Sequence, residues 1–408
     1  MDTLDISTSS LIPSEHQAAG HDGCMTLNSL FFKPTNQQEL DFYTKCYEVD
    51  HQRLNKLENK EKEAEEEGEE EEGVDLGALI THWMPAWLGI LNEGDIRVNH
   101  RSSVSNSPSS QLHNQQDLVK PNTEKTQYIV LQNLYHKYLH PSILDIKLGS
   151  KLTDDSKTTK EKIARLQKVS ETTTSGSLGF RICGMKQYIG KETLKPQSEL
   201  FHGMNENTIV LQKNKECITI NGETIVEHHN YLEYNKHFGR SLNKHNVEDA
   251  LQLFFSKIPP TQAAWLIQRF HQRLQLLYNC LLSYEVRIFS GSLLFIIEGD
   301  KRVWKKMVDE EKYANSDPLI CEFDPTSDDE KEEEEEEFEK KEPAKEKQAN
   351  LVNTIFIPVN ESPEKLSGLH IIDFAHAKFV EGAGHDDNIL DGIENLIDIF
   401  AKLAENNV

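Results

Sequence analysis

The stretch PSILDIKLG, residues 141–149, constrains the fold of this chain more than any other part of the sequence. A β-strand points successive side chains to opposite faces, which puts Asp145 and Lys147 together on one face. Lysine binds phosphate, and aspartate binds a hydroxyl group or a metal-bound water. A surface strand with an ordinary ion pair is the alternative for a lone D-x-K pattern. The opposite face is predicted to be buried and carries three apolar side chains: Leu144, Ile146 and Leu148.

The full spacing P-x-x-x-D-x-K-x-G resembles the signature of the inositol polyphosphate kinase family. This resemblance implies an α+β, two-lobed fold like that of protein kinases and ATP-grasp enzymes, with a small inositol-binding segment after the signature. It also implies transfer of the γ-phosphoryl group of ATP, with Mg2+, to a hydroxyl of an inositol polyphosphate. As catalytic residues it indicates Asp145, near the ribose, and Lys147, between the γ-phosphate and the accepting hydroxyl.

The charge of the chain is concentrated in two acidic tracts. The 408 residues have a net charge of -24, but residues 58–75 contribute -9 and residues 322–346 contribute -10. The remainder carries only -5, so a basic pocket for a polyanion is compatible with it. Both tracts have too few apolar residues to pack, and we expect solvated insertions.

Composition also predicts where the protein acts. Its 6 cysteines lack paired-ligand spacing, which favours reduced thiols. The N-terminus has no basic and apolar leader pattern, and no apolar run reaches the ~18 residues of a spanning helix. We therefore expect a protein of the nucleus and cytoplasm, without a transmembrane segment, acting as a monomer.

The changes in composition predict one catalytic body with insertions. We expect a disordered N-terminus at 1–15, followed by an N-lobe at 16–133 and a C-lobe at 134–408. The expected subdivisions are an acidic insertion at 55–75, a polar loop at 99–125, the inositol-binding segment at 150–178 and a second acidic insertion at 322–350.

Two apolar strands of the N-lobe end at polar positions. The first, residues 30–33, ends at Lys33; the second, residues 127–134, contains Gln132 and Leu134. A lysine after a strand is usually only solvated. The resemblance implies ATP binding by Lys33, on the phosphates, and by Gln132 and Leu134, at the hinge beside the adenine; relatives usually have Glu at the position of Gln132.

The sequence becomes basic after the signature. Residues 147–168 have a net charge of +4, and Thr158 with Glu161 predicts a capping box for the helix that follows. A row of cations on one helix face suits several phosphates, although such a row is more often simply solvated. The resemblance implies substrate binding by Lys147, Lys162, Arg165, Lys168 and, from the element KHFGRS, Arg240.

Residues 170–186 form a hydroxyl-rich turn that leads through Gly176 and Gly179 into an apolar strand. Backbone N–H groups of such a turn can cradle phosphate, although it is not a Walker A loop. This segment is similar to the fungal-type multikinases of the family and is the most specific match in the chain.

Two apolar strands carry the residues that are expected at the metal ion. One contains Ser292 and resembles the S-S-L-L element of the family, with Gly291 in place of the first serine. The other ends at Asp373, in an I-D-F element. An aspartate at a strand end can simply cap a turn, but the resemblance implies that Asp373 binds ATP and Mg2+ and that Ser292 lies at the metal.

Within the family the sequence favours a multikinase acting on inositol tris- and tetrakisphosphate. A trisphosphate 3-kinase and a hexakisphosphate kinase share the signature and stay open. A scaffold or transcriptional co-regulator is a further alternative, in which acidic tracts bind basic nuclear partners or transcription factors and kinase activity is secondary. The charge balance disfavours direct DNA binding. Zinc motifs and the protein-kinase H-R-D loop are absent from the sequence.

Overall fold

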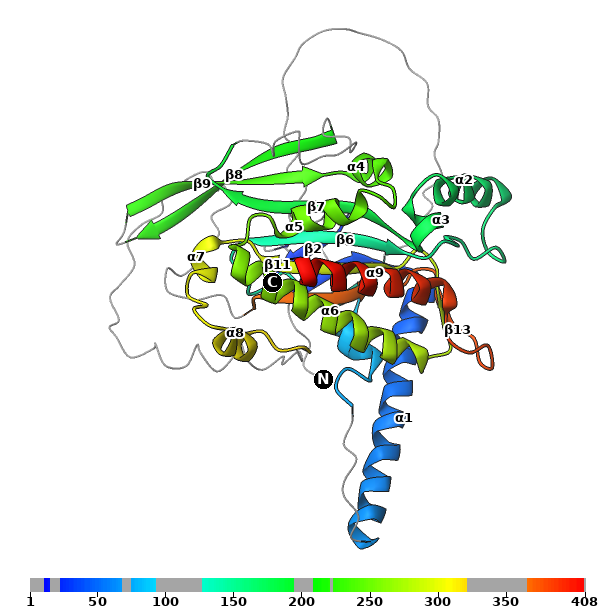
Figure 1. Ribbon diagram of the computed structural model, residues 1–408. Helices are drawn as coiled ribbons and strands as arrows, with labels where there is room; N and C mark the ends of the chain where they lie inside the picture. Colours follow the sequence, from blue (N-terminus) through cyan, green and yellow to red (C-terminus); the bar gives the residue numbers. More distant parts are fainter. Residues whose placement is uncertain are drawn as a thin grey trace, which may run out of the picture.

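Two antiparallel β-sheets organise the residues that this computed structural model describes, namely 11–14, 23–67, 75–92, 127–193, 208–220, 223–320 and 365–406. The smaller sheet comes from the N-terminal part of the chain, and the larger sheet comes from the rest. In Figure 1 two long helices lie against the larger sheet, and a third helix extends away from the body.

The smaller sheet has the strand order β1-β2-β3-β5-β4. Its third strand ends just after Lys33 and pairs with the hinge strand, as the two apolar runs predict. The alternation of burial along these strands leaves Phe32, Ile129 and Leu131 in the core. The bounds are β1 (Ile12–Pro13), β2 (Met25–Leu27), β3 (Leu30–Pro34), β4 (Trp87–Asn92) and β5 (Gln127–Gln132).

The prediction of a disordered N-terminus at 1–15 is wrong for Ile12–Pro13. These two residues form β1 and pair with β2, so that Ile12 lies opposite Thr26. A short edge strand needs little apolar surface, which is why composition alone did not indicate it. Residues 1–10 and 15 lie outside the described part of the chain.

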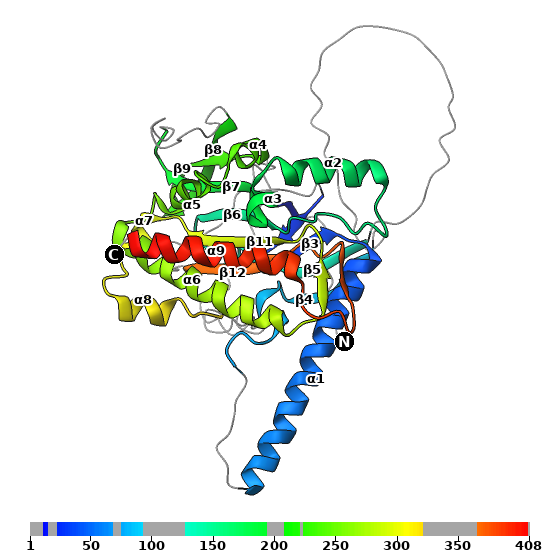
Figure 2. The ribbon, with the colours of Figure 1, turned by 45° about the vertical axis from the view of Figure 1, so that its right-hand side comes forward.

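A helix of 31 residues reaches into the first acidic tract. It is α1 (Gln37–Glu67), and it buries Leu40, Tyr43 and Cys46 before it leaves the body (Figures 1 and 2). The expected acidic insertion at 55–75 is therefore helical as far as Glu67, because Glu, Lys and Ala have high helix propensity. Residues 68–74, the polar loop at 99–125 and the second acidic insertion at 322–350 lie outside the described residues.

The larger sheet has the strand order β12-β11-β6-β7-β9-β8. The signature strand is β6, and it pairs with β11 on one side and β7 on the other. It is therefore shielded by strands along both edges. The bounds are β6 (Pro141–Leu148), β7 (Phe180–Gly190), β8 (Ile209–Ile220), β9 (Glu223–Tyr234), β11 (Ser292–Glu298) and β12 (Ser367–Ile372).

Helices α6 (Pro260–Leu282) and α9 (Asp387–Asn406) cover one face of this sheet (Figures 1 and 2). The ring of Phe295 stacks on Phe400 with centroids 5.6 Å apart and lies 5.1 Å from Phe270. Burial of each large apolar side chain contributes about 2 kcal/mol. The predicted apolar face of the signature strand is confirmed, because three side chains are at most 1% exposed in this core: Leu144, Ile146 and Leu148.

The other face of the sheet carries a smaller apolar cluster of Leu134, Ile143, Leu294 and Ile296. This cluster lies beside the hinge. The remaining elements are η2 (Ile80–Trp83), α2 (Lys160–Glu171), α3 (Thr174–Leu178), α4 (Lys236–Ser241), α5 (Val247–Phe255), β10 (Val286–Ile288), α7 (Lys301–Trp304), α8 (Glu310–Ser316) and β13 (Ala377–Phe379).

The long hairpin of β8 and β9 was not predicted, since residues 187–235 showed no clear pattern. The two strands pair from Ile209 to Tyr234, with Ile220 opposite Glu223. The two residues between them in the sequence are Asn221 and Gly222, and Asn-Gly between two alternating strands is the strongest short-range signal for a hairpin. That dipeptide was the available signal.

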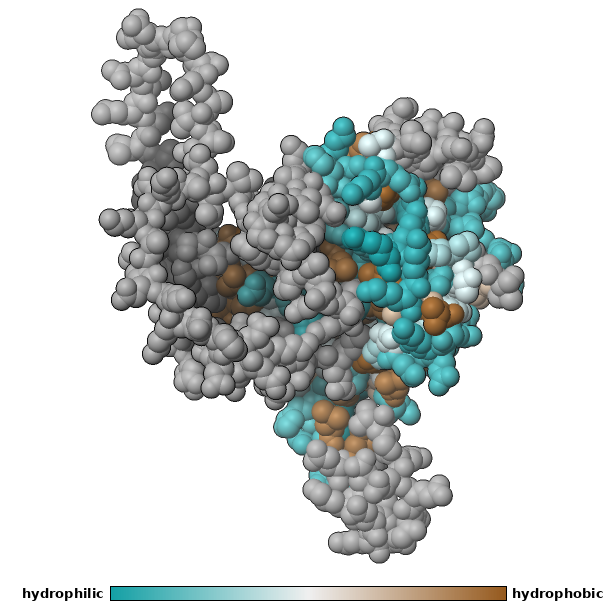
Figure 3. All heavy atoms as spheres, turned by 90° about the vertical axis from the view of Figure 1, so that its left-hand side faces the viewer, coloured by the Kyte–Doolittle hydropathy of each residue, from teal (hydrophilic) through white to brown (hydrophobic). Residues whose placement is uncertain are grey.

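The surface of the described residues carries apolar side chains in small groups. On the face shown in Figure 3 most coloured residues are hydrophilic, and hydrophobic ones are scattered. Separately exposed apolar side chains need no partner to explain them. None of the described helices has the length and apolarity to cross a membrane.

We predict that Gly239→Ala destabilises the protein by about 1–3 kcal/mol or more, the usual effect of overpacking. A Cβ atom at Gly239 would lie 1.8 Å from the carbonyl oxygen of Ile182, so α4 could not stay docked on β7. Urea unfolding measures the change. His237→Ala, on the exposed side of the same helix, is the control; equal stability of both variants would contradict the prediction.

Candidate active site

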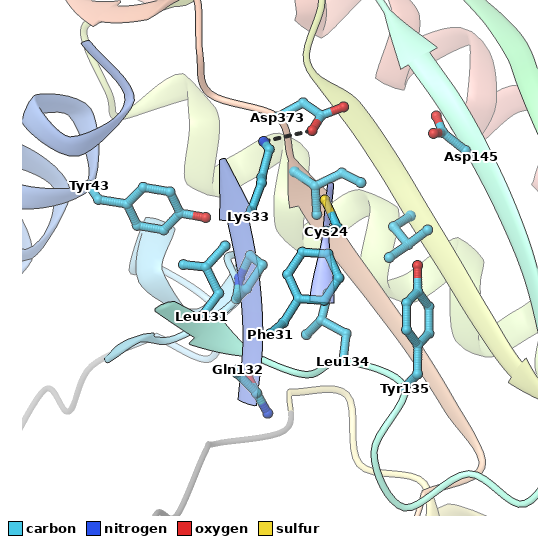
Figure 4. Close-up of a pocket in the computed structure, with 13 residues that line it drawn as sticks. Cys24, Phe31, Lys33, Tyr43, Leu131, Gln132, Leu134, Tyr135, Asp145 and Asp373 are labelled. Atoms are coloured by element: carbon cyan, nitrogen blue, oxygen red, sulfur yellow. Dashed lines mark hydrogen bonds and ion pairs between the residues drawn. The ribbon is translucent and has the colours of Figure 1, made fainter. Parts of the chain in front are cut away.

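A cavity of about 690 Å3, part of which opens to solvent, lies where the two sheets meet. Strands of both sheets, the hinge and α1 contribute to it (Figure 4). Its lining brings together many of the residues predicted to bind a nucleotide. The full lining consists of Cys24, Phe31, Lys33, Tyr43, Pro85, Leu131, Gln132, Leu134, Tyr135, Asp145, Leu294, Ile372 and Asp373.

Lys33 joins the two sheets through ion pairs. Its Nζ atom lies 2.8 Å from Oε1 of Glu39 and 2.9 Å from Oδ1 of Asp373 (Figure 4). Burial disfavours the charged amine, but the two carboxylates outweigh it and raise the pKa of Lys33 above its ordinary value. The lysine is therefore a permanent cation inside the cavity.

Glu39 is a site residue that the sequence analysis missed. It is 1% exposed, in the first turn of α1, and its carboxylate also accepts hydrogen bonds from the backbone N–H of Phe374 and the hydroxyl of Thr35. It thus fixes Lys33 and the residue after Asp373 at once. The available signal was a glutamate at the start of the helix that follows the lysine strand, the arrangement that protein kinases use to hold their lysine.

Asp373 directly follows β12 and has a φ angle of +70°. This left-handed conformation is uncommon for a residue other than glycine and turns the chain sharply at the strand end. Its carboxylate therefore points back toward Lys33, as Figure 4 shows, instead of continuing along the sheet.

Asp145 lies deeper in the same cavity and is 4% exposed. Burial raises its pKa to about 6; Asp373 adds to this effect, while Lys147 and the Ser292 hydroxyl oppose it. Its Oδ1 atom is buried without a hydrogen-bond partner among the described residues. An acceptor is therefore available to a ligand.

Lys147 belongs to a row of polar side chains that crosses the larger sheet. In the strand register it lies opposite Ser292 on one side and Arg181 on the other. Its Nζ atom donates to the carbonyl of Ser290 at 2.7 Å. Arg181 is 9% exposed, donates to the Ser175 hydroxyl at 2.9 Å and was not predicted. An arginine opposite the signature lysine could have been recognised only from the pairing.

The basic helix α2 begins one residue later than expected. Its N-cap is Thr159, whose hydroxyl accepts from the N–H of Lys162, so the predicted capping box of Thr158 and Glu161 is wrong. Lys162, Arg165 and Lys168 are exposed along this helix.

The charge of Lys162 acts on His376. Burial lowers the pKa of His376, and the charges of Lys162 and Lys147 lower it further. His376 is thus close enough to both lysines to respond to their charges, and it was also missed. It stands three residues after Asp373 in the I-D-F element, which was the available signal.

The structure does not bring Arg240 into the cavity. It is exposed in the last turn of α4, which packs on β7, and it is not among the described residues that line the cavity. Its predicted contact with substrate stays a prediction.

The glycines of the hydroxyl-rich turn lie where two backbone segments come close together. A Cβ at Gly179 would lie 2.8 Å from the backbone nitrogen of Gly392 in α9, and a Cβ at Gly176 would lie 2.6 Å from the carbonyl of Ser170. The turn itself is the short helix α3. The close backbone contacts use the space that the glycines leave, and the expected phosphate cradle of backbone N–H groups stays a prediction.

The hinge residues Gln132 and Leu134 both line the cavity. The N–H of Gln132 donates to Ala86 at 2.8 Å, and the Gln132 side chain accepts weakly from the N–H of Ala86 at 3.5 Å. Leu134 is 7% exposed and forms part of the cavity wall. Gln132 thus holds the hinge to the segment before β4.

The acidic residues fit a divalent cation held mainly by a ligand's phosphates. The described residues contain no group of three or more His, Cys, Asp or Glu side chains that could hold a metal by themselves. Mg2+ is usually bound by one or two carboxylates together with phosphate oxygens. Asp373 can supply such a carboxylate, whereas Ser292 is fully buried and faces Asp145.

Comparisons with known proteins agree on the class. The family model for inositol polyphosphate kinase matches residues 128–401. The inositol polyphosphate multikinase of Saccharomyces cerevisiae is 35% identical over 403 residues, 95% of this chain and 97% of the relative. That of Schizosaccharomyces pombe is 23% identical over 394 residues, 96% and 97% of the two chains.

A solved structure supports the same conclusion. The inositol phosphate multikinase of S. cerevisiae in complex with ADP and Mn2+ superposes with a TM-score of 0.56 at 30% identity, covering 92% of this chain and 99% of that one. The chain therefore belongs to the inositol polyphosphate kinase family. It is a kinase with the α+β fold of that family, as the signature predicts.

We predict that Asp145→Asn makes the protein more stable at neutral pH. The pKa of Asp145 is about 6 in the fold and about 4 when unfolded. Ionisation of Asp145 therefore destabilises the fold, and the free energy of unfolding falls as the pH rises from about 4 to about 6. The variant avoids this cost, worth about 2–3 kcal/mol, and its melting temperature should exceed that of the wild type increasingly up to about pH 6, and by a constant amount above it.

Asp154→Asn is the matched control, for which we expect the opposite change in melting temperature at neutral pH. Although burial raises the pKa of Asp154, hydrogen bonds from Lys378 and Ser156 outweigh it and lower the value to about 2. That carboxylate stabilises the fold above about pH 4 and loses this effect as the pH falls toward about 2. Its variant should melt lower at neutral pH, and a pH-independent shift in both variants would contradict the assignment.

Proposed function

We propose that this protein is an ATP-dependent inositol polyphosphate multikinase that transfers the γ-phosphoryl group to hydroxyls of inositol tris- and tetrakisphosphate. The observation that carries the proposal is one cavity that holds Lys33, Asp145 and Asp373 next to the polar row of Lys147 and Arg181. The full-length similarity to two fungal multikinases favours this activity over a trisphosphate 3-kinase or a hexakisphosphate kinase.

The nucleotide is assigned to the cavity. Leu134 and the backbone of Gln132 bind the adenine, Asp145 binds the ribose and Lys33 binds the phosphates. Supporting this order, the hinge and Lys33 line opposite parts of the cavity in Figure 4, with Asp145 to one side. Asp373, beside Lys33, would hold a divalent cation, and we assign Mg2+ in the cell; the cation neutralises charge on the phosphates.

The acceptor is assigned to the open side beside Lys147. Lys147 lies next to the transferred phosphoryl group, and Arg181, His376 and Lys162 surround the other phosphates, with Arg165, Lys168 and Arg240 farther out. The Pγ–O bond to ADP breaks while a new P–O bond forms to the inositol hydroxyl, which releases a proton. Alignment and charge neutralisation supply most of the catalysis in such a transfer.

We predict that Lys147→Ala lowers kcat by at least about a hundredfold, since it removes a cation that stabilises charge in the transition state. Turnover of inositol trisphosphate with labelled ATP measures it. Lys301→Ala, at a surface ion pair with Glu192, is the control and should keep full activity. Unchanged turnover in Lys147→Ala would sink the proposed function.

We predict that Lys162→Ala raises KM for inositol trisphosphate about three- to tenfold, the effect of one hydrogen bond to a phosphate at a solvated position. The KM for ATP should stay constant, because the lysine is not part of the nucleotide cavity. Lys160→Ala, at the start of the same helix, is the matched control. Equal effects of the two variants would show that α2 acts only through its total charge.

Three further proposals concern the oligomeric state, the location and the partners of the protein. We propose that the protein acts as a monomer in nucleus and cytoplasm, and that its acidic tracts bind basic nuclear partners or transcription factors in addition to the kinase activity. The high local charge of the tracts supports binding of basic segments. Removal of both tracts should abolish capture of a basic peptide and leave turnover intact.

A further inference from the structure

Tyr135 stands at the base of the cavity and has no role in the assignments above. It follows the hinge in a turn that Asn133 holds in place: the Asn133 side chain accepts from the N–H of Tyr135 at 3.2 Å and donates to the carbonyl of Asn28 at 2.8 Å. The turn is therefore fixed to the smaller sheet. The backbone of Tyr135 is therefore held in place relative to that sheet.

The ring of Tyr135 packs against the apolar cluster of Leu134 and Leu294. Its hydroxyl points from this wall into the cavity, toward the side on which Asp145 lies (Figure 4). Burial, followed by the charges of Asp145 and Asp373, raises the pKa of Tyr135. The phenol therefore stays protonated and can donate a hydrogen bond near the carboxylates.

Asp145 offers the complementary group. Its buried Oδ1 atom accepts no hydrogen bond from the described residues, and its side chain lines the same cavity. A carboxylate acceptor and a phenol that both donates and accepts match two adjacent hydroxyl groups on one ring. If a nucleotide lacks one of the two hydroxyl groups, the side chain that faces it is left without its hydrogen bond. The site therefore selects nucleotides that carry both hydroxyl groups.

We propose that Tyr135 and Asp145 together bind the 2′,3′-diol of the nucleotide ribose, and that the Tyr135 hydroxyl makes the protein select ribonucleotides over deoxyribonucleotides. This inference rests on the proposed nucleotide site but not on the identity of the acceptor. Tyr135 is a substrate-binding residue in this role, and the apolar part of its ring only completes the wall.

The test compares nucleotide binding by the wild type and Tyr135→Phe in calorimetric titrations with Mn2+ and without inositol phosphate. The nucleotides are ATP, 2′-deoxy-ATP and 3′-deoxy-ATP. We expect Kd for ATP to rise about three- to tenfold in the variant, the effect of one neutral hydrogen bond. One of the two deoxynucleotides lacks the ribose hydroxyl that Tyr135 binds. Its Kd should be the same for the wild type and the variant.

Two controls make the result specific. Tyr138→Phe alters another tyrosine that packs on the same cluster without lining the cavity, and it should leave all three affinities unchanged. Tyr135→Leu also removes the hydroxyl but keeps an apolar wall, and it should reproduce the loss for ATP. An equal loss for all three nucleotides, or no loss for any of them, overturns the inference.

The outcome separates this inference from the proposed function. A wild-type protein that binds ATP but phosphorylates no inositol phosphate would contradict the proposed function and leave the diol comparison valid. A protein that phosphorylates inositol trisphosphate but shows the same ATP preference after Tyr135→Phe would contradict only the inference.

Discussion

The ion cluster of Lys33, Glu39 and Asp373 is the contact on which the arrangement of the cavity depends. The lysine and Asp373 are 340 positions apart in the sequence, yet their charged atoms lie 2.9 Å apart. An unpaired charge at this depth would cost several kcal/mol, so each member requires the other two. Because Glu39 also holds the backbone beside Asp373, the smaller sheet, α1 and the end of β12 are placed by one set of contacts.

The signature strand explains how one segment serves both stability and chemistry. Leu144, Ile146 and Leu148 pack under α6 and α9, and Asp145 and Lys147 belong to the opposite face, where Asp145 lines the cavity. Both neighbours of the strand pair with it along nearly its whole length. Asp145 and Lys147 are therefore held in a strand that is paired on both edges, which favours the alignment that phosphoryl transfer requires.

Local sequence patterns predicted strands well where the strands show regular alternation or a continuous apolar run. The alternation of residues 141–149 correctly gave the two faces of β6, and the apolar runs gave β3, β5 and β11. Contacts between distant strands were not accessible in this way. Arg181 is known to lie opposite Lys147 only from the pairing, and Glu39 joins the cluster only because α1 packs across the sheets.

Boundaries and glycines were the weaker predictions for a physical reason. The capping hydroxyl of α2 is Thr159 and not its neighbour Thr158, a choice that tertiary packing makes between two equivalent residues. The glycines after α2 suggested a phosphate cradle, but the same residue type is also used where two backbones touch. Sequence alone does not distinguish the two uses.

The contact between Gly179 and Gly392 gives the end of the chain an unexpected part in the kinase. Helix α9 touches the segment after the signature strand backbone to backbone there, and its Asn388 also binds both the N–H and the carbonyl of Lys151. A frameshift that replaced only this helix would spare every residue that lines the cavity and still leave the segment after the signature strand without its support.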